Sequence, residues 1–261
     1  MKYGFIGCGN MGGSIARALS RSTKDILLSD PSPKALELAH ELGCRAGNNM
    51  EVVNSCDRIF LAVKPQIMAS VLQPIADILA AKKPLIITMA AGIGISKVES
   101  IIGTSLPVIR IMPNTPVAVG KGMILYCSNE LVNDTDIADF LEDMQYAGVL
   151  DRLDEDLINV GSALSGSGPA YMYYFMEAMA AGAAAHGLSF EQAIEHAAVT
   201  MEGAAQMILQ TSRHPKDLKD AVCSPGGSTI EGLRALEEHN FFEAVTDCIS
   251  AAYKRNLELG Q

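Results

Sequence analysis

The residues from Asp220 to Thr229, DAVCSPGGST, combine one proline, two glycines and three hydroxyl side chains immediately before a helical pattern that begins at Ser228. A helix that begins here leaves its first backbone N–H groups without partners inside the helix. Those groups and the positive end of the helix dipole attract anions. The turn is therefore a candidate site for a carboxylate or a phosphate, although an ordinary helix cap rich in turn residues has the same composition.

A second glycine-rich turn, Gly7-Cys8-Gly9-Asn10-Met11-Gly12, follows an apolar run at 3–6 and precedes a helical pattern at 11–20. The spacing G-x-G-x-x-G after a strand is typical of dinucleotide binding. In that motif Gly7 permits the tight turn, Gly9 lets the backbone approach a pyrophosphate, and Gly12 lets the helix pack closely on the strand. The setting favours a nicotinamide dinucleotide over a purely structural strand-to-helix turn.

Asp30 follows a second strand-like run, at 25–29, about twenty residues beyond the glycine turn. A carboxylate at this point accepts hydrogen bonds from an unmodified ribose and repels a 2′-phosphate, which argues for NADH. Ser29, Ser32 and Lys34 surround the same point and would hold a phosphate if Asp30 turned away. The residues leave the choice between NADH and NADPH open.

Short β-branched runs alternate with helical patterns over the first 150 residues, which is typical of a doubly wound α/β sheet. Pro74 is expected to break one helix, and Ser32 and Asn133 are expected N-caps. Further strands are predicted at 58–62, 85–89, 108–111 and 123–126, and helices at 34–42, 66–80 and 134–145.

After about Leu153 the pattern becomes helical, with helices predicted at 169–186, 190–210, 215–222, 228–238 and 241–257. The most apolar stretch, 170–185, is shorter than the ~20 residues that a membrane span needs, so it predicts a buried helix. Its small residues would let a helix of the same or of a second subunit approach closely. We predict a doubly wound α/β domain at residues 1–160 and an all-helical domain at 161–261.

Three further loops follow predicted strands, and ligands bind at the carboxyl ends of strands in an open α/β sheet. They are Ala62-Val63-Lys64-Pro65, Ala90-Ala91-Gly92 and 112–116, in which Asn114 lies between two prolines. Small residues leave room for a cofactor, and Lys64 is placed to reach a phosphate or a ribose. Each loop taken alone is equally typical of a short turn punctuated by proline.

The composition excludes several classes of protein. A formal net charge of −10 without a basic run argues against nucleic acid or an anionic membrane as a partner. Six cysteines without a C-x-x-C pair or metal-ligand spacing indicate a reduced compartment and no metal site. The chain starts with a short strand and a glycine turn instead of the apolar core of a secretory signal, so a cytoplasmic protein is expected.

Six motifs, taken together, resemble those of the pyrroline-5-carboxylate reductases, the last enzymes of proline synthesis, over essentially the whole chain. The string Ser224-Pro225-Gly226-Gly227-x-Thr229 is the most specific of them, whereas many dehydrogenases share the glycine turn. The six are the segments 7–12, 62–65, 89–92, 110–116, 165–171 and 220–229.

The resemblance implies a Rossmann domain for NAD(P)H, followed by a helical domain that interlocks with a second subunit to form a homodimer or a larger assembly of dimers. It implies that Thr229 is the catalytic residue, with its hydroxyl directed at the imine nitrogen. The residues implied to hold the substrate carboxylate are Ser224, Pro225, Gly226, Gly227, Ser228 and Thr229. Those implied to bind the cofactor are Ile6, Gly7, Gly9, Asn10, Met11, Gly12, Ser29, Asp30, Asn49, Ala62, Val63, Lys64, Pro65, Ala90, Ala91, Gly92 and Asn114. Asp30 departs from what a strict NADPH enzyme would carry.

The expected chemistry needs few ionisable groups. A protonated cyclic imine already carries the positive charge that hydride neutralises, whereas a ketone needs a proton donor such as Lys or His. No lysine lies between Lys121 and Lys216, and none of the five histidines lies in a glycine-rich loop. This weakens the alternative of a β-hydroxyacid reductase of similar architecture. A reductase for another cyclic imine and a non-catalytic dinucleotide-binding protein remain as further alternatives.

Overall fold

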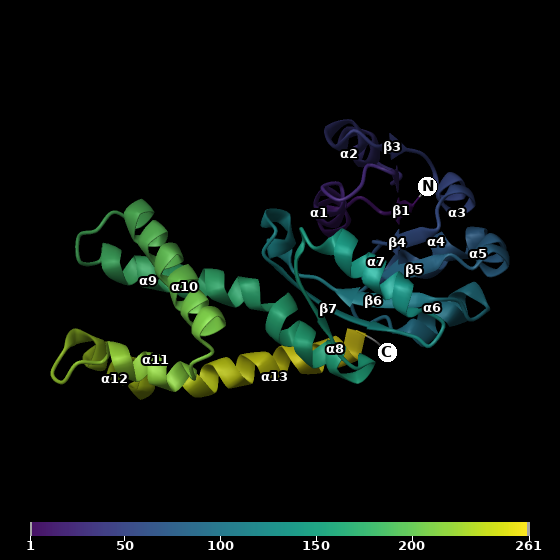
Figure 1. The fold of residues 1–261 in the computed structure, drawn as a ribbon. Coiled ribbons are helices and arrows are strands. Elements are labelled where there is room, and N and C mark those ends of the chain that lie inside the picture. Colours follow the sequence, from purple (N-terminus) through teal and green to yellow (C-terminus); the bar gives the residue numbers. More distant parts are fainter. Residues whose placement is uncertain (1, 260–261) are drawn as a thin grey trace. The chain divides into compact units, whose positions relative to one another are not determined.

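Eight strands form one sheet in the part of the chain that the structure, a computed structural model, describes, namely residues 2–259 (Figure 1). The strand order is β3-β2-β1-β4-β5-β6-β7-β8, and β7 runs antiparallel to β6 while the other neighbours are parallel. The strands are β1 (Tyr3–Ile6), β2 (Ile26–Ser29), β3 (Arg45–Ala46), β4 (Arg58–Leu61), β5 (Leu85–Thr88), β6 (Val108–Met112), β7 (Gly122–Ser128) and β8 (Gly148–Arg152). The order reverses between β1 and β4, the switch point where such sheets bind ligands.

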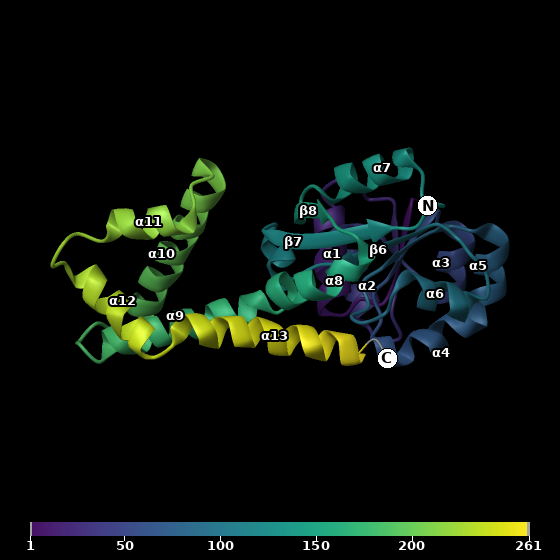
Figure 2. The same ribbon diagram turned by 90° about the horizontal axis from the view of Figure 1, so that it is seen from below.

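Two apolar cores lie on opposite faces of this sheet. One face is covered by α1 (Asn10–Leu19), α2 (Lys34–Leu42) and α7 (Asp134–Met144). The other is covered by α3 (Asn49–Ser55), α4 (Met68–Leu72), α5 (Ala76–Lys82), α6 (Ile95–Ile102) and α8 (Glu155–Gly161). Figure 2 shows α7 and α6 on the two sides of the strands. Because both faces are buried, the central strands are continuous apolar runs, which explains why the sequence identified them.

The chain divides into two units, Met1–Pro169 with Ala252–Gln261, and Ala170–Ala251. The second unit is helical. Its helices are α9 (Gly168–Ala184), which starts at the end of the first unit, α10 (Phe190–Thr211), α11 (Pro215–Val222), α12 (Ser228–Glu238) and α13 (Phe241–Leu259), which returns to the first unit.

The expectation that 170–185 forms a buried helix is wrong for the single chain. Among the described residues of α9, Ala180 alone is fully buried. Tyr174 is 76% exposed and Phe242, on α13, is 77% exposed. Apolar side chains of these helices lie at the surface of the single chain, so the sequence pattern overestimated their burial.

Most predicted elements are confirmed to within a few residues, and one predicted N-cap is wrong. The predicted helix at 66–80 is interrupted by the 3₁₀ turn η2 (Gln73–Ile75), as Pro74 requires. Asn133 does cap α7 and accepts the N–H of Asp136 at 2.9 Å. Ser32, in contrast, is not the N-cap of α2. That position belongs to Pro33; the hydroxyl of Ser32 donates to Asp30 Oδ1 at 2.6 Å and accepts the Lys34 N–H at 3.4 Å.

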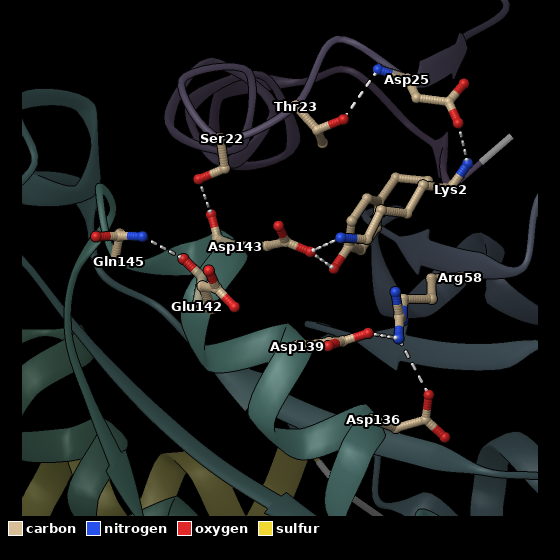
Figure 3. A network of polar contacts seen from close by, with 11 residues as sticks. Lys2, Ser22, Thr23, Asp25, Arg58, Asp136, Asp139, Glu142, Asp143 and Gln145 are labelled. Atoms are coloured by element: carbon tan, nitrogen blue, oxygen red, sulfur yellow. Dashed lines mark hydrogen bonds and ion pairs between the residues drawn. The ribbon is translucent and has the colours of Figure 1, made fainter.

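A polar network fastens α7 to the amino ends of β1 and β4 (Figure 3). The fully buried Tyr3 donates from Oη to Asp143 Oδ2 at 2.7 Å, and Lys2 Nζ lies 2.7 Å from the same oxygen. Arg58 bridges to Asp139 at 2.6 Å. Burial, followed by the hydrogen bond to Asp143, raises the pKa of Tyr3 far above its usual value, so the phenol stays a donor. The network anchors the sheet at the edge opposite to the glycine turn.

Candidate cofactor and substrate sites

Close packing explains two of the three glycines in the turn after β1. Gly7 has φ +102°, and a Cβ there would lie 2.6 Å from the carbonyl oxygen of Ala62. A Cβ on Gly12 would lie 2.5 Å from the oxygen of Gly7 and 2.8 Å from Cβ of Ala62. A Cβ on Gly9 would meet no described atom within 4 Å. Gly7 and Gly12 therefore let α1 pack on the strand ends, while the backbone at Gly9 opens outward, where a ligand can approach it.

The start of α1 is suited to an anion. Its N-cap is Gly9, and no described side chain caps the helix or adds an acidic group to its first turn. The first intrahelical bond of the turn runs from Gly13 N–H to Gly9 O at 2.7 Å. The amides that precede Gly13 in the helix have no partner in an earlier turn and, with the helix dipole, favour a pyrophosphate there.

Asp30 lies against the glycine turn and is not turned away from it. Its Oδ2 accepts the Cys8 N–H at 2.7 Å, and its Oδ1 accepts the N–H and the hydroxyl of Ser32 at 2.9 and 2.6 Å. Burial alone would raise the pKa of Asp30, but hydrogen bonds from Ser32 and from the Cys8 amide outweigh it and hold the pKa below its usual range. The ionised carboxylate is thus fixed at the end of β2.

The hydroxyls that were expected as an alternative phosphate site are engaged inside the protein. Ser29 is buried and donates from Oγ to Asn49 Oδ1 at 2.6 Å, which joins β2 to the first residue of α3. Ser32 donates to Asp30. Lys34 stays exposed at the start of α2. The structure brings Ser29, Asp30 and Asn49 together at the end of β2.

The loops after β4, β5 and β6 end at the same edge of the sheet as the glycine turn. Ala62 N–H donates to Ile6 O at 2.9 Å, and Lys64 beyond it is exposed. Ala90 accepts the Ile93 N–H at 3.2 Å around Gly92, whose φ is +74°. The parallel pairing of β1, β4, β5 and β6 therefore collects the predicted cofactor residues at one edge.

Asn114 is buried, and its amide links the loop after β6 to two other segments. Oδ1 accepts the Met123 N–H at 2.9 Å, and Nδ2 donates to Ser165 O at 2.9 Å. Ser165 lies in η4 (Ser162–Gly166), a single π-helical turn. Such turns are frequent at functional sites. The side chain thus fixes the loop, and its contact with a nicotinamide stays a prediction.

The sequence reasoning missed an ion pair behind the loop after β5. Arg110, on β6, is almost fully buried, and its Nη1 lies 3.1 Å from Glu155 Oε1 while Nη2 donates to Asn159 Oδ1 at 3.3 Å. The same Glu155 oxygen accepts the Ile95 N–H at 2.8 Å. These groups line a pocket of about 790 Å³ together with Gly94. An arginine inside an apolar strand signals an acidic partner, but nothing in the sequence identifies Glu155, whose side chain is 37% exposed, as that partner.

The turn that contains Ser224–Thr229 has the backbone expected of an anion-binding helix start. Ser224 O accepts the Gly227 N–H at 3.0 Å, and Gly226 between them has φ +71°. Gly227 is the N-cap of α12, and no described side chain caps this helix. Ser224 is exposed and Thr229 half-buried. All predicted substrate residues lie in the 170–251 unit, whereas all predicted cofactor residues lie in the other unit.

Residues 2–259 contain no group of three or more His, Cys, Asp or Glu side chains placed to hold a metal ion. No helix among them is long and apolar enough to cross a membrane. All six cysteines are free thiols.

The chain is an NAD(P)-dependent oxidoreductase of the Rossmann type. This follows from the strand order 3-2-1-4-5-6, from the glycine turn at the switch point and from the ionised Asp30 beside that turn. Residues 2–92 match the family model described as NADP oxidoreductase coenzyme F420-dependent, and residues 155–259 match pyrroline-5-carboxylate reductase dimerisation. The chain belongs to the pyrroline-5-carboxylate reductase family.

Curated relatives and solved structures match over the full chain. The pyrroline-5-carboxylate reductase of Escherichia coli is 41% identical over 266 residues, which cover 100% of this chain and 98% of the relative. The Plasmodium falciparum pyrroline carboxylate reductase, solved with NADP bound, has a TM-score of 0.91 at 32% identity and covers 100% of this chain and 98% of that one. The Coxiella burnetii pyrroline-5-carboxylate reductase gives 0.91 at 33% identity with the same coverage.

Proposed function

We propose that this chain reduces 1-pyrroline-5-carboxylate to L-proline with hydride from NAD(P)H, the last step of proline biosynthesis. The observation that carries the proposal is the uncapped start of α12 behind Ser224-Pro225-Gly226-Gly227, because the glycine turn after β1 is common to many dehydrogenases. The substrate is a small anion with a ring imine. Its carboxylate requires an anion-binding site such as a helix start, whereas its reduction requires little acid catalysis.

In this proposal the two parts of the chain have separate tasks. Residues 1–160 bind the cofactor, and residues 161–261 bind the substrate carboxylate and form the dimer. The backbone N–H groups at the start of α12 and the hydroxyls of Ser224 and Ser228 hold the carboxylate. The hydroxyl of Thr229, in the first turn of α12, is directed at the imine nitrogen and keeps its proton in place.

The residues at the carboxyl edge of the sheet fit a dinucleotide. The open backbone at Gly9 and the uncapped start of α1 suit the pyrophosphate, and the small residues Ala90, Ala91 and Gly92 suit the nicotinamide. When bound, NAD(P)H supplies the hydride for the imine carbon. The protein's part is to orient the two reactants and to exclude water, because a protonated imine needs little acid catalysis.

We further propose that NADH is preferred over NADPH. Three hydrogen bonds fix the carboxylate of Asp30 beside the turn, and they keep it ionised. The hydroxyls of Ser29 and Ser32, which would otherwise bind a 2′-phosphate, already donate to Asn49 and to Asp30. A 2′-phosphate would therefore meet a fixed negative charge and few free donors.

We propose a homodimer, or a larger assembly of dimers, built on the helical unit. Its exposed apolar side chains, Tyr173, Tyr174, Val199 and Phe242 among them, support a subunit interface. The net charge of −10 gives no reason to expect nucleic acid or an anionic membrane as a partner. We place the enzyme in the cytoplasm, where its free thiols would stay reduced.

The test is the loss of nicotinamide absorbance when NADH or NADPH is mixed with racemic pyrroline-5-carboxylate, with a 2-keto acid as the control substrate. Turnover of the imine alone supports the proposal, and the ratio of the two cofactors tests the role of Asp30. Turnover of only a larger cyclic imine or a β-hydroxyacid would assign the chain another substrate. Cofactor binding without turnover of any of these would make it a non-catalytic dinucleotide-binding protein.

A further inference from the structure

Helix α6 is capped by a residue from a distant part of the chain. Its N-cap is Gly94, which has no side chain to accept the first amide. Glu155, sixty residues later at the start of α8, accepts the Ile95 N–H at 2.8 Å instead. The approach is close, since a Cβ on Gly94 would lie 3.0 Å from Glu155 Oε1. The loop between β5 and α6 therefore ends on a hydrogen bond to Glu155.

The same carboxylate neutralises a buried cation. The side chain of Arg110 is 4% exposed, and Nη1 lies 3.1 Å from Glu155 Oε1. Its Nε has no hydrogen-bond partner among the described residues, so the guanidinium relies on Glu155 and Asn159. A buried charge holds its partner firmly, because separating the two leaves the charge uncompensated. Arg110 thus holds Glu155 in place.

These contacts join the two loops that are proposed to line the nicotinamide. Ile95 directly follows the loop at 90–94, and Arg110 lies on the strand that leads to Asn114. The first part of this loop is held by packing, because Ala90 is buried in the core and Ala91 and Ile93 pack against it. Gly92, at φ +74°, and Gly94 carry no side chain, so the part of the loop that leads into α6 depends more on its anchored end at Ile95.

We propose that Glu155 is a positioning residue for hydride transfer. By holding the Ile95 N–H and Arg110, it fixes the loop at 90–94 against which the nicotinamide ring lies. The inference rests on the proposed function, because it takes that loop as the nicotinamide pocket. A displacement of about 1 Å in such a pocket costs about a hundredfold in rate, so a residue that never touches the ring can govern turnover.

The experiment compares Glu155→Ala and Glu155→Gln with the wild type. We expect Glu155→Ala to lower kcat by about tenfold or more, with little change in the KM for the imine. Glu155→Gln keeps an oxygen that accepts the Ile95 N–H but leaves Arg110 without its counter-charge, so its kcat should lie between those of Glu155→Ala and the wild type. Asp156→Asn is the matched control, because Asp156 lines the same pocket, one residue away, and makes no ion pair within residues 2–259. It should behave as the wild type.

A binding measurement separates positioning from a merely structural role. The affinities for NADH and for ADP-ribose, which lacks the nicotinamide, are measured by calorimetry on each folded variant. Glu155→Ala should weaken the binding of NADH by about fivefold relative to the binding of ADP-ribose, which is the effect of roughly one lost hydrogen bond. Equal changes for both ligands, or an unchanged kcat, would overturn the proposal. If Glu155→Ala does not fold, Glu155→Asp, whose carboxylate is one methylene short of Ile95, is judged by the same criteria.

The failure of this inference is distinguishable from the failure of the proposed function. A wild type without imine turnover would contradict the proposed function. The ratio of the NADH and ADP-ribose affinities would still decide whether Glu155 fixes the nicotinamide loop. A wild type with full turnover and variants with unchanged turnover would contradict the inference alone.

Discussion

The backbone N–H of Cys8 donates a 2.7 Å hydrogen bond to Oδ2 of Asp30. One carboxylate thus joins the glycine turn after β1 to the end of β2, and it does so at the point where the ribose of a dinucleotide lies in folds of this type. The position of Asp30 is therefore set by the protein itself and does not depend on the ligand.

Replacement of Asp30 should change the choice of cofactor. In Asp30→Ser the fixed negative charge is gone, so the ratio of kcat/KM for NADH to that for NADPH should fall by about tenfold or more, which corresponds to ~1.4 kcal/mol. The exposed Glu37 on α2 provides a charge-matched control, and Glu37→Gln should leave the ratio as it is. An unchanged ratio in Asp30→Ser would show that Asp30 does not select between the two cofactors.

Two glycines of the same turn should respond to alanine in opposite ways. Gly7→Ala forces a Cβ onto the Ala62 carbonyl at a φ of +102°, and it should lower the free energy of unfolding by about 2 kcal/mol or more. The Cβ that Gly9→Ala adds would meet no described atom within 4 Å, so this variant should fold normally, yet bind the cofactor about tenfold more weakly. Urea unfolding and calorimetric titration check the pair. Normal NADH affinity in a folded Gly9→Ala would contradict the proposed approach of the pyrophosphate.

The two ends of the turn before α12 should affect different kinetic constants. Thr229→Ala removes the hydroxyl that is proposed to point at the imine nitrogen, and it should lower kcat by about tenfold, with an unchanged melting temperature. Ser224→Ala should chiefly raise the KM for the imino acid, because it removes one donor to the carboxylate. Steady-state kinetics with a thermal melt of each variant separates the cases. Full activity of Thr229→Ala would show that its assigned role is wrong.

The thiol of Cys8 should resist alkylation although it lies in the cofactor turn. Burial, followed by the nearby charge of Asp30, raises the pKa of Cys8 to about 12. The thiolate is the reactive form, and it becomes populated only as the pH rises toward the pKa, so the native protein should remain unmodified at Cys8 at neutral pH and up to about pH 10. In urea the thiol regains its ordinary pKa, and modification should follow. Peptide mapping after iodoacetamide treatment checks this, and rapid labelling of native Cys8 would contradict it.

The elements that the sequence predicted correctly are those set by interactions between residues close together in the chain. The bounds of β1, α2, α11 and α12 were predicted to the residue, because apolar periodicity and turn residues are local signals. The short elements β3, α3, α6, β8 and α8 gave too little periodicity to be recognised. The predicted cofactor residues did gather at one sheet edge, because parallel pairing aligns the carboxyl ends of strands.

Long-range polar contacts were beyond local reasoning. Glu155 reaches Arg110 across 45 residues, and Tyr3 reaches Asp143 across 140. Burial of α9 was also misjudged, since its apolar sequence does not reveal whether another helix of the same chain or of a second subunit would cover it. Each failure concerns a partner that the neighbouring sequence does not contain.

Helices α1, α6 and α12 each have a glycine as N-cap, and none is capped by a side chain of its own N-cap residue. Glu155 completes α6 from within the protein, whereas α1 and α12 begin where the cofactor and the substrate are proposed to bind. Their phosphate and carboxylate oxygens would then act as the missing caps. Part of the thermal stability of this enzyme would be supplied by its own metabolites, so that its melting temperature would report on how much of each is bound.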